Sequence, residues 1–376
     1  MVINENEKKK IIPVAGGKGG VGKTLIAANL AIQLARNNKK TVVVDLDMGG
    51  ANLHTCLGIK NNNPGIGNLL SGSGMSFEDL IVRTPYENLR FIPGDVMVAG
   101  MADITTSQRK KVISGLLDIE SDYIIMDLAT GSSCNVIDFF LVSNSGFLVT
   151  SHQTMSILNT FEFLKSMIFR YLQSTFNSNK KVSGYLKKMT KEKRPNSQLE
   201  MSRTLQELQK LDQEAEKKAR EALSMLKPQL IINMADSSDD LEIIQKLRNL
   251  VKTSLEIDLG CLGMVYSDQR VSEALEESTP VVEYDQQAIF SREIERIAQK
   301  IIQSESFPDM PLDLDYYSDS FELARIEADN DREEIQASQK PEEEFDVGEL
   351  LSIISQQKKQ IQELRGTVRM LTMKNP

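Results

Sequence analysis

A glycine-rich segment near the start of the chain most constrains how this sequence can fold. Gly16–Thr24 reads GGKGGVGKT; it follows the apolar run 11–15 and precedes an apolar helical pattern from Leu25 to Leu34. Residues 17–24 match G-x-x-x-x-G-K-[ST], in which backbone N–H groups and a helix N-terminus surround phosphates. Lys23 supplies a positive charge for the β- and γ-phosphates, and the Thr24 hydroxyl can ligate Mg²⁺. The segment therefore predicts a phosphate-binding loop whose nucleotide contacts are Gly17, Lys18, Gly19, Gly20, Val21, Gly22, Lys23, Thr24 and Leu25.

Two further strand patterns end in aspartate. The β-branched run 41–44 leads into Asp45 and Asp47, and the apolar run 123–126 leads into Asp127, with Gly131 close behind. Carboxylates at the carboxyl ends of parallel strands face the ligand crevice of an open α/β sheet. The predicted fold is an α/β, doubly wound, mostly parallel sheet with helices on both faces.

The early lysine of the loop, Lys18, narrows this class. The stretch K-G-G-x-G-K-T resembles the deviant Walker A signature of the MinD/ParA family of ATPases, and D-x-D-x-G-x-x-N-L from Asp45 resembles its switch I. The resemblance implies ATP and Mg²⁺ as cofactors. It implies a homodimer that forms across ATP, in which Lys18 of each subunit enters the nucleotide site of the other. It also implies roles for individual residues. Those roles are catalysis for Lys18, Lys23 and Asp47, metal coordination for Thr24, Asp45 and Asp127, and nucleotide sensing for Asn52. Gly131 is expected to bind the nucleotide as part of a mobile switch II.

The end of the domain supplies the expected base contacts. Asn233 ends the apolar strand pattern 230–232, and an amide can pair with an adenine edge. The stretch from Gly263 to Asp268 resembles the family loop beside the base, so Val265, Tyr266 and Asp268 are expected there, although Tyr266 replaces a common proline. The resemblance covers about residues 10–176 and 228–303.

Cysteine usage and hydropathy limit the alternatives. The three cysteines, Cys56, Cys134 and Cys261, form no C-x-x-C pair, so we expect neither an iron–sulfur cluster nor a disulfide framework. The chain has no apolar run long enough to span a bilayer, and its first ten residues are mostly polar. We expect a cytoplasmic protein, and peripheral attachment to the inner face of the cell membrane stays open.

An insertion spans about residues 177–227. Its first part is basic, with seven lysines and arginines against Glu192 between residues 180 and 194, and its second part, 199–226, has helical leucine spacing. The basic run fits either a solvated loop or a surface for DNA or acidic lipid headgroups. A similar helical insertion is found in the FlhG-like branch of the family, which regulates flagellar number.

Composition changes after the domain. We expect a polar N-terminal tail at 1–10, the ATPase domain at 11–304, an acidic linker at 305–344 and a helix at 345–373. Residues 305–346 hold fifteen Asp and Glu against three Lys and Arg, in a chain of net charge −9. The last segment carries an a/d heptad seam from Val347 to Leu371, which indicates a coiled coil or partner helix, with a membrane-binding helix as the alternative.

Together these patterns indicate a switch ATPase, dimerising with ATP and hydrolysing it slowly, that controls the position, number or recruitment of a cellular structure. Two alternatives stay open. One is a nucleotide-binding adaptor that acts through its C-terminal coiled coil. The other is a ParA-like ATPase that positions a DNA cargo.

Overall fold

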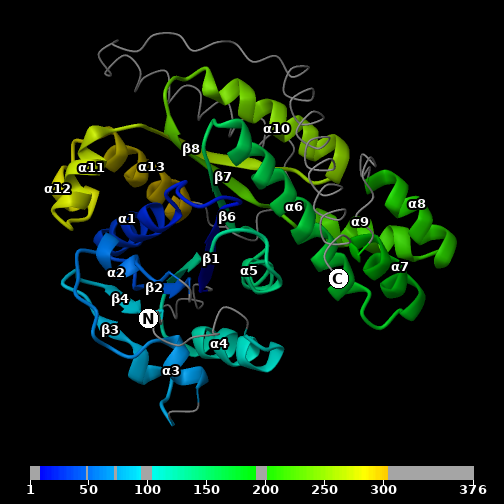
Figure 1. The fold of residues 1–376 in the computed structure, drawn as a ribbon, viewed down its shortest axis with the longest axis horizontal. Coiled ribbons are helices and arrows are strands. Elements are labelled where there is room, and N and C mark those ends of the chain that lie inside the picture. The colour runs from blue at the N-terminus through cyan, green and yellow to red at the C-terminus, as the bar shows by residue number, and fades with distance from the viewer. Residues whose placement is uncertain (1–8, 48–49, 72–73, 95–103, 192–200, 304–376) are drawn as a thin grey trace, which may run out of the picture. The chain divides into compact units, whose positions relative to one another are not determined.

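The computed structural model describes residues 9–47, 50–71, 74–94, 104–191 and 201–303 (Figure 1). The strands are β1 (Lys10–Ala15), β2 (Thr41–Leu46), β3 (Val82–Arg83), β4 (Leu89–Ile92), β5 (Tyr123–Leu128), β6 (Phe147–Thr150), β7 (Gln229–Ala235) and β8 (Gly260–Tyr266). The helices are α1 (Lys23–Arg36), α2 (Leu53–Cys56), α3 (Ile66–Leu70), α4 (Thr106–Asp118), α5 (Cys134–Phe140), α6 (Thr154–Thr175), α7 (Lys180–Lys191), α8 (Met201–Leu211), α9 (Ala215–Ser224), α10 (Asp240–Leu255), α11 (Gln269–Glu276), α12 (Val281–Tyr284) and α13 (Ile289–Gln303). The expected C-terminal helix lies outside the described residues.

These strands form one sheet in the order β3-β4-β2-β5-β1-β6-β7-β8. Every neighbouring pair is parallel except β3 with β4. The chain starts in the middle at β1, builds outward through β2 and β4, and later builds to the other side through β6, β7 and β8. This confirms the predicted doubly wound, mostly parallel fold, and it puts the carboxyl ends of β1, β2, β5 and β7 at one edge.

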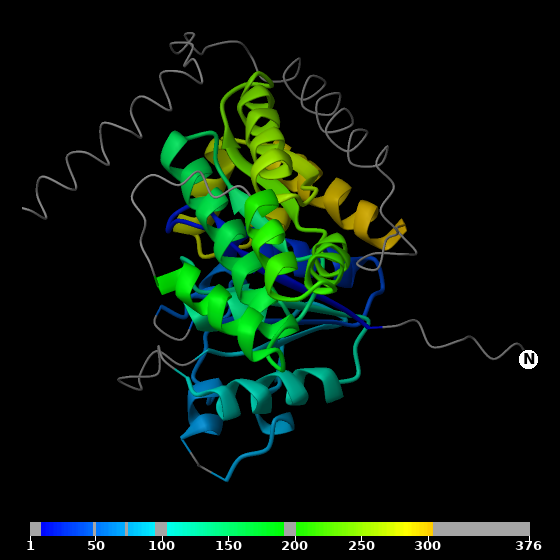
Figure 2. The ribbon, with the colours of Figure 1, turned by 90° about the vertical axis from the view of Figure 1, so that its right-hand side faces the viewer.

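Helices cover both faces because the strand residues alternate. Val42 and Val44 belong to the core shared with α4–α10, whereas Val43 belongs to the core shared with α1 and α11–α13. Such two-sided burial is why these strands read as continuous apolar runs. Figure 2 turns the first layer toward the viewer, with α6 and the helices α7 to α10 in front of the sheet.

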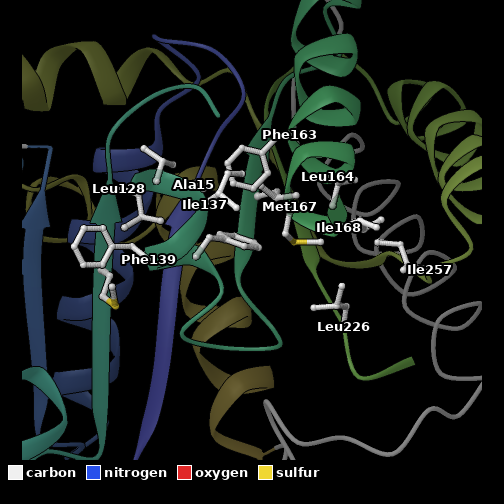
Figure 3. Close-up of a cluster of buried hydrophobic side chains, with 14 of the residues drawn as sticks. Ala15, Leu128, Ile137, Phe139, Phe163, Leu164, Met167, Ile168, Leu226 and Ile257 are labelled. Atoms are coloured by element: carbon white, nitrogen blue, oxygen red, sulfur yellow. The ribbon is translucent and has the colours of Figure 1, made fainter. Parts of the chain in front are cut away.

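Helix α6 anchors the larger core. Phe163 and Met167 from α6 lie toward Ile137 of α5, whereas Leu164 and Ile168 lie on the side of Leu226 and Ile257 (Figure 3). Phe140 and Phe163 meet edge to face with ring centroids 5.1 Å apart. Leu226 and Ile257 close the same cluster at its far end, so the insertion shares the main core.

The insertion is more regular than a solvated loop. The basic run begins inside α7, where Val182 and Leu186 are fully buried and Lys180, Lys181, Lys187 and Lys188 are exposed. The stretch 199–226, whose leucine spacing predicted helix, forms two helices, α8 and α9, separated around Asp212. Asp212 accepts a hydrogen bond from Asn179 at 2.7 Å, and this bond joins the break to the start of α7. Leucine spacing alone does not reveal such a break. Within the described ranges, no helix has the length and apolar character needed to cross a membrane.

Candidate functional site

The phosphate-binding loop joins β1 to α1, as its sequence predicted. Gly20 and Gly22 have φ angles of 81° and 87°, a left-handed conformation that favours glycine. A Cβ on Gly17 would overlap the backbone of Asn159 in α6, so that glycine is required for close packing. The backbone N–H of Gly131 donates to the Gly16 carbonyl at 3.2 Å, which ties the segment after β5 to the loop.

Asp45 and Asp127 lie side by side at the ends of β2 and β5. Their Cα atoms are register partners, and each residue is 1% exposed. Burial, partly offset by backbone N–H donors from Leu53 and Asp47, raises the pKa of Asp45 to about 7. Burial and the neighbouring Asp45 charge raise the pKa of Asp127 to about 8, although the Thr24 hydroxyl favours its charged form. Two adjacent carboxylates of this kind favour a shared cation.

Mg²⁺ fits this donor set. Neither carboxylate oxygen of Asp127 has a partner with full hydrogen-bond geometry, so a buried acceptor is left for a cation or its water. No group of three or more His, Cys, Asp or Glu able to hold a metal occurs in the part of the chain described. Mg²⁺ is usually held by one or two carboxylates together with phosphate oxygens, so Asp127, Asp45 and the Thr24 hydroxyl meet its needs only beside a nucleotide.

The two lysines of the loop have different environments. Lys23 is 6% exposed, and burial lowers its pKa while the charges of Asp127 and Asp47 oppose that shift. Lys18 is exposed, and no polar partner for it occurs among the described residues. Asp47 is partly exposed and its backbone N–H donates to Asp45 at 3.0 Å. Lys23 therefore points into the site, whereas Lys18 is accessible from outside it.

The predicted base contacts are placed differently from one another. The Asn233 side chain donates from Nδ2 to the Val21 carbonyl at 2.9 Å, so that donor serves the loop. Val265 and Tyr266 are 0% and 2% exposed within β8, which leaves little side-chain surface for a ligand. Asp268 caps α11 by accepting from the Arg270 N–H at 2.9 Å. Capping gives Asp268 a structural role that the sequence reasoning missed.

The remaining expected contacts lie at the edges of the site. Asn52 is exposed and precedes α2, with its backbone carbonyl accepting from Thr55 at 3.0 Å. Leu25 is 9% exposed on the first turn of α1 and contributes to the core. The structure thus brings together the loop, Asp45, Asp47, Asp127 and Gly131, with Asn52 and Leu25 at the periphery.

Sequence reasoning also missed an ion-pair network behind the site. Asp138 in α5 accepts from Nε and Nη2 of Arg170 in α6 at 2.6 and 2.7 Å. Arg109 of α4 reaches the same carboxylate at 2.9 Å and donates to Asn135 at 2.5 Å. The network fixes α5, the helix that follows Gly131, between α4 and α6. No motif marks these residues, because their partners are remote in the sequence.

This geometry defines a nucleotide-binding α/β protein of the P-loop class, with ATP and Mg²⁺ as the cofactors that the site fits. Residues 12–281 match the model of the CobQ/CobB/MinD/ParA nucleotide binding domain. The chain belongs to this family, as the motifs around Lys18 and Asp45 predicted.

Two curated relatives show the similarity in sequence. The antiactivator FleN of Pseudomonas aeruginosa is 27% identical over 191 residues, which cover 48% of this chain and 67% of FleN. The septum site-determining protein MinD of Buchnera aphidicola subsp. Schizaphis graminum is 32% identical over 149 residues, 39% of this chain and 55% of that protein. The matches thus span about two thirds and about half of these relatives. The similarity to FleN supports placement in the FlhG-like branch.

Solved structures show the same fold. MinD complexed with Mg-ADP from Pyrococcus horikoshii has a TM-score of 0.54 at 21% identity, covering 78% of this chain and 96% of that one. A ParA family ATPase from Chlorobium tepidum has a TM-score of 0.53 at 16% identity, with coverage of 78% and 99%. At these identities the likeness establishes the fold.

Proposed function

We propose that this protein is an ATP-dependent dimerising switch that hydrolyses ATP slowly and controls the position, number or recruitment of a cellular structure. The observation that carries the proposal is the contrast between buried Lys23 and exposed Lys18 in one loop. A second lysine that the same loop leaves exposed to solvent is suited to a site on another subunit. The family membership and the similarity to FleN and MinD support a regulatory role of this kind.

Each side chain has a defined task in this proposal. Lys23 neutralises the β- and γ-phosphates, and Asp47, partly exposed beside the buried carboxylates, orients the attacking water. Mg²⁺, when bound, neutralises charge on the phosphate oxygens. Asp45 and Asp127 hold that cation's water shell. Lys18 from the second subunit stabilises the charge that develops during hydrolysis.

Substitution of the two lysines tests the dimer. Lys18→Ala should leave ATP affinity within about twofold, because the side chain is exposed in the single chain, yet reduce turnover by about 10²-fold or more, as for loss of one charge-stabilising donor. Lys60→Ala, an exposed lysine outside the loop, is the control. Turnover of the unsubstituted protein should lie below about 1 s⁻¹. Full activity of Lys18→Ala would refute a shared site.

The oligomeric state supplies a second readout. Asp47→Ala should trap a dimer in ATP but not in ADP, as measured by light scattering coupled to size exclusion. A monomer in both nucleotides would favour the adaptor alternative, in which nucleotide binds without cycling.

The surface that the switch occupies is tested with the same trapped variant. The exposed lysines of α7 support an anionic partner, because α7 carries no acidic residue. Flotation of Asp47→Ala with anionic liposomes in ATP but not in ADP would identify a membrane. Retention on duplex DNA that weakens steeply with salt would identify a DNA cargo instead. Binding to neither would leave a protein partner, for which the segment 345–373 is the proposed contact.

A further inference from the structure

Strand β7 departs from regular geometry where it reaches the phosphate-binding loop. Met234 has a φ of 56°, and the pairing of β7 with β8 shifts register between Ile232 and Ala235. Successive residues of a regular strand point to opposite faces, and an irregularity of this kind redirects a side chain. Here both Asn233 and Met234 approach Gly22. A Cβ built on Gly22 would overlap Asn233 Nδ2 and lie 3.8 Å from Met234 Cε.

His152 fixes this irregular segment from the loop after β6. Its Nδ1 lies 3.0 Å from the Met234 carbonyl oxygen and 3.6 Å from an Asp240 carboxylate oxygen. Its Nε2 lies 3.3 Å from Asp236. The imidazole thus bridges the loops that follow two neighbouring strands. A left-handed residue other than glycine costs about 1–2 kcal/mol and persists where surrounding contacts enforce it.

Met234 is also the one exposed residue of β7 and β8, whose other residues are all buried. It is 38% exposed, whereas Tyr266, the residue expected beside the base, is 2% exposed. The donor group of Asn233 is already used by Val21. An apolar surface beside the phosphate-binding loop is therefore supplied by Met234, whose flexible thioether packs well against flat aromatic rings.

We propose that Met234 forms the apolar contact for the purine base of the bound nucleotide and that His152 is its positioning residue. This inference rests on the proposed binding of ATP. It transfers the base contact from Asn233 and Tyr266 to a residue that no motif marks. The strained backbone is retained because it places the side chain beside the loop.

Calorimetric titration of the full chain with ATP and with inorganic tripolyphosphate, both with Mg²⁺, tests this. Tripolyphosphate reports on the phosphate loop alone, so only ATP should respond to the base contact. Met234→Ala should weaken the affinity for ATP about tenfold, which corresponds to about 1.4 kcal/mol. The affinity for tripolyphosphate should stay within about twofold. Met225→Ala, a 55% exposed methionine after α9, is the matched control and should change neither.

The positioning role has its own variants. His152→Ala should weaken the affinity for ATP by roughly threefold to tenfold, as expected for the loss of one or two hydrogen bonds. His152→Asn, whose amide can donate to the Met234 carbonyl, should restore that affinity. Equal losses for ATP and tripolyphosphate, or no loss in Met234→Ala, would overturn the inference. Failure of the unsubstituted protein to bind either ligand would instead refute the proposed nucleotide site. Thermal unfolding of each variant shows whether it has folded.

Discussion

Asp45 and Asp127 occupy paired positions on adjacent parallel strands, both almost completely buried. The sheet brings together two carboxyl groups that are separated by about eighty residues in the chain. The arrangement is unfavourable without a cation, because burial and mutual repulsion both disfavour the charged forms. The stability of the protein without bound Mg²⁺ should therefore depend on pH.

The unfolding free energy should fall as the pH rises from about 4 to about 8. The folded-state pKa values of about 7 and about 8 exceed the ordinary 3.8, so the folded state holds more protons than the unfolded chain in this range. The contribution of this pair to stability is fully present below the unfolded-state pKa of 3.8. It is lost as the pH rises through the folded-state values of about 7 and about 8. Asp127→Asn should flatten this slope and raise the melting temperature at pH 8 while abolishing Mg²⁺-dependent turnover. Melting curves between pH 5 and 9 provide the measurement.

Asp79→Asn is the control for that slope. Asp79 is exposed, and hydrogen bonds from Ser76 lower its pKa, so its contribution is lost only as the pH falls below the usual range. It should leave the slope between pH 5 and 9 unchanged. A melting temperature that is independent of pH in the unsubstituted protein would show that the buried pair is not protonated.

Gly22→Ala should destabilise more than Gly20→Ala. Both glycines have left-handed φ angles, so each substitution carries a backbone penalty of about 1 kcal/mol. A Cβ at Gly20 meets nothing within 4 Å, whereas one at Gly22 overlaps Asn233 Nδ2. The double variant Gly22→Ala/Asn233→Ala should then be less destabilised than the sum of the single ones. Strictly additive melting shifts would show that Asn233 does not determine the glycine.

Asp138→Ala should lower stability by about 3 kcal/mol, because it leaves the buried Arg109 without its charge partner. For a domain of this size, that corresponds to a decrease in melting temperature of about 6 °C. Glu216→Ala breaks the exposed pair with Arg220 and should cost under about 1 kcal/mol. Equal shifts for the two variants would argue against a stabilising network between α4, α5 and α6.

Gly184→Ala should stabilise the protein by about 0.5–1 kcal/mol. Gly184 is exposed in the middle of α7 and a Cβ there meets nothing within 4 Å, so alanine gains helix propensity without a clash. Urea unfolding at constant m-value measures the gain. A neutral or negative effect would indicate that the basic run is not helical in solution.

The sequence by itself determined the elements whose signal is local. The loop 17–24, the strands ending at Asp45 and Asp127 and the helix after Lys23 were all predicted, because glycine spacing, buried β-branched runs and their terminal carboxylates report directly on neighbouring backbone. The doubly wound sheet followed from the order of these units. The family signature at Lys18 was likewise readable from the sequence, since it lies within a few residues of β1.

Only the tertiary structure decided what depends on remote partners. Basic composition did not reveal that α7 is a helix with a buried apolar side, and leucine spacing did not reveal the break between α8 and α9. Asn233 matched a base-binding pattern, but packing directs its amide to Val21. Tyr266 is buried because β8 is covered on both faces, and Asp268 caps a helix. Contacts such as these arise where chain segments far apart in sequence meet, so no local pattern of residues encodes them.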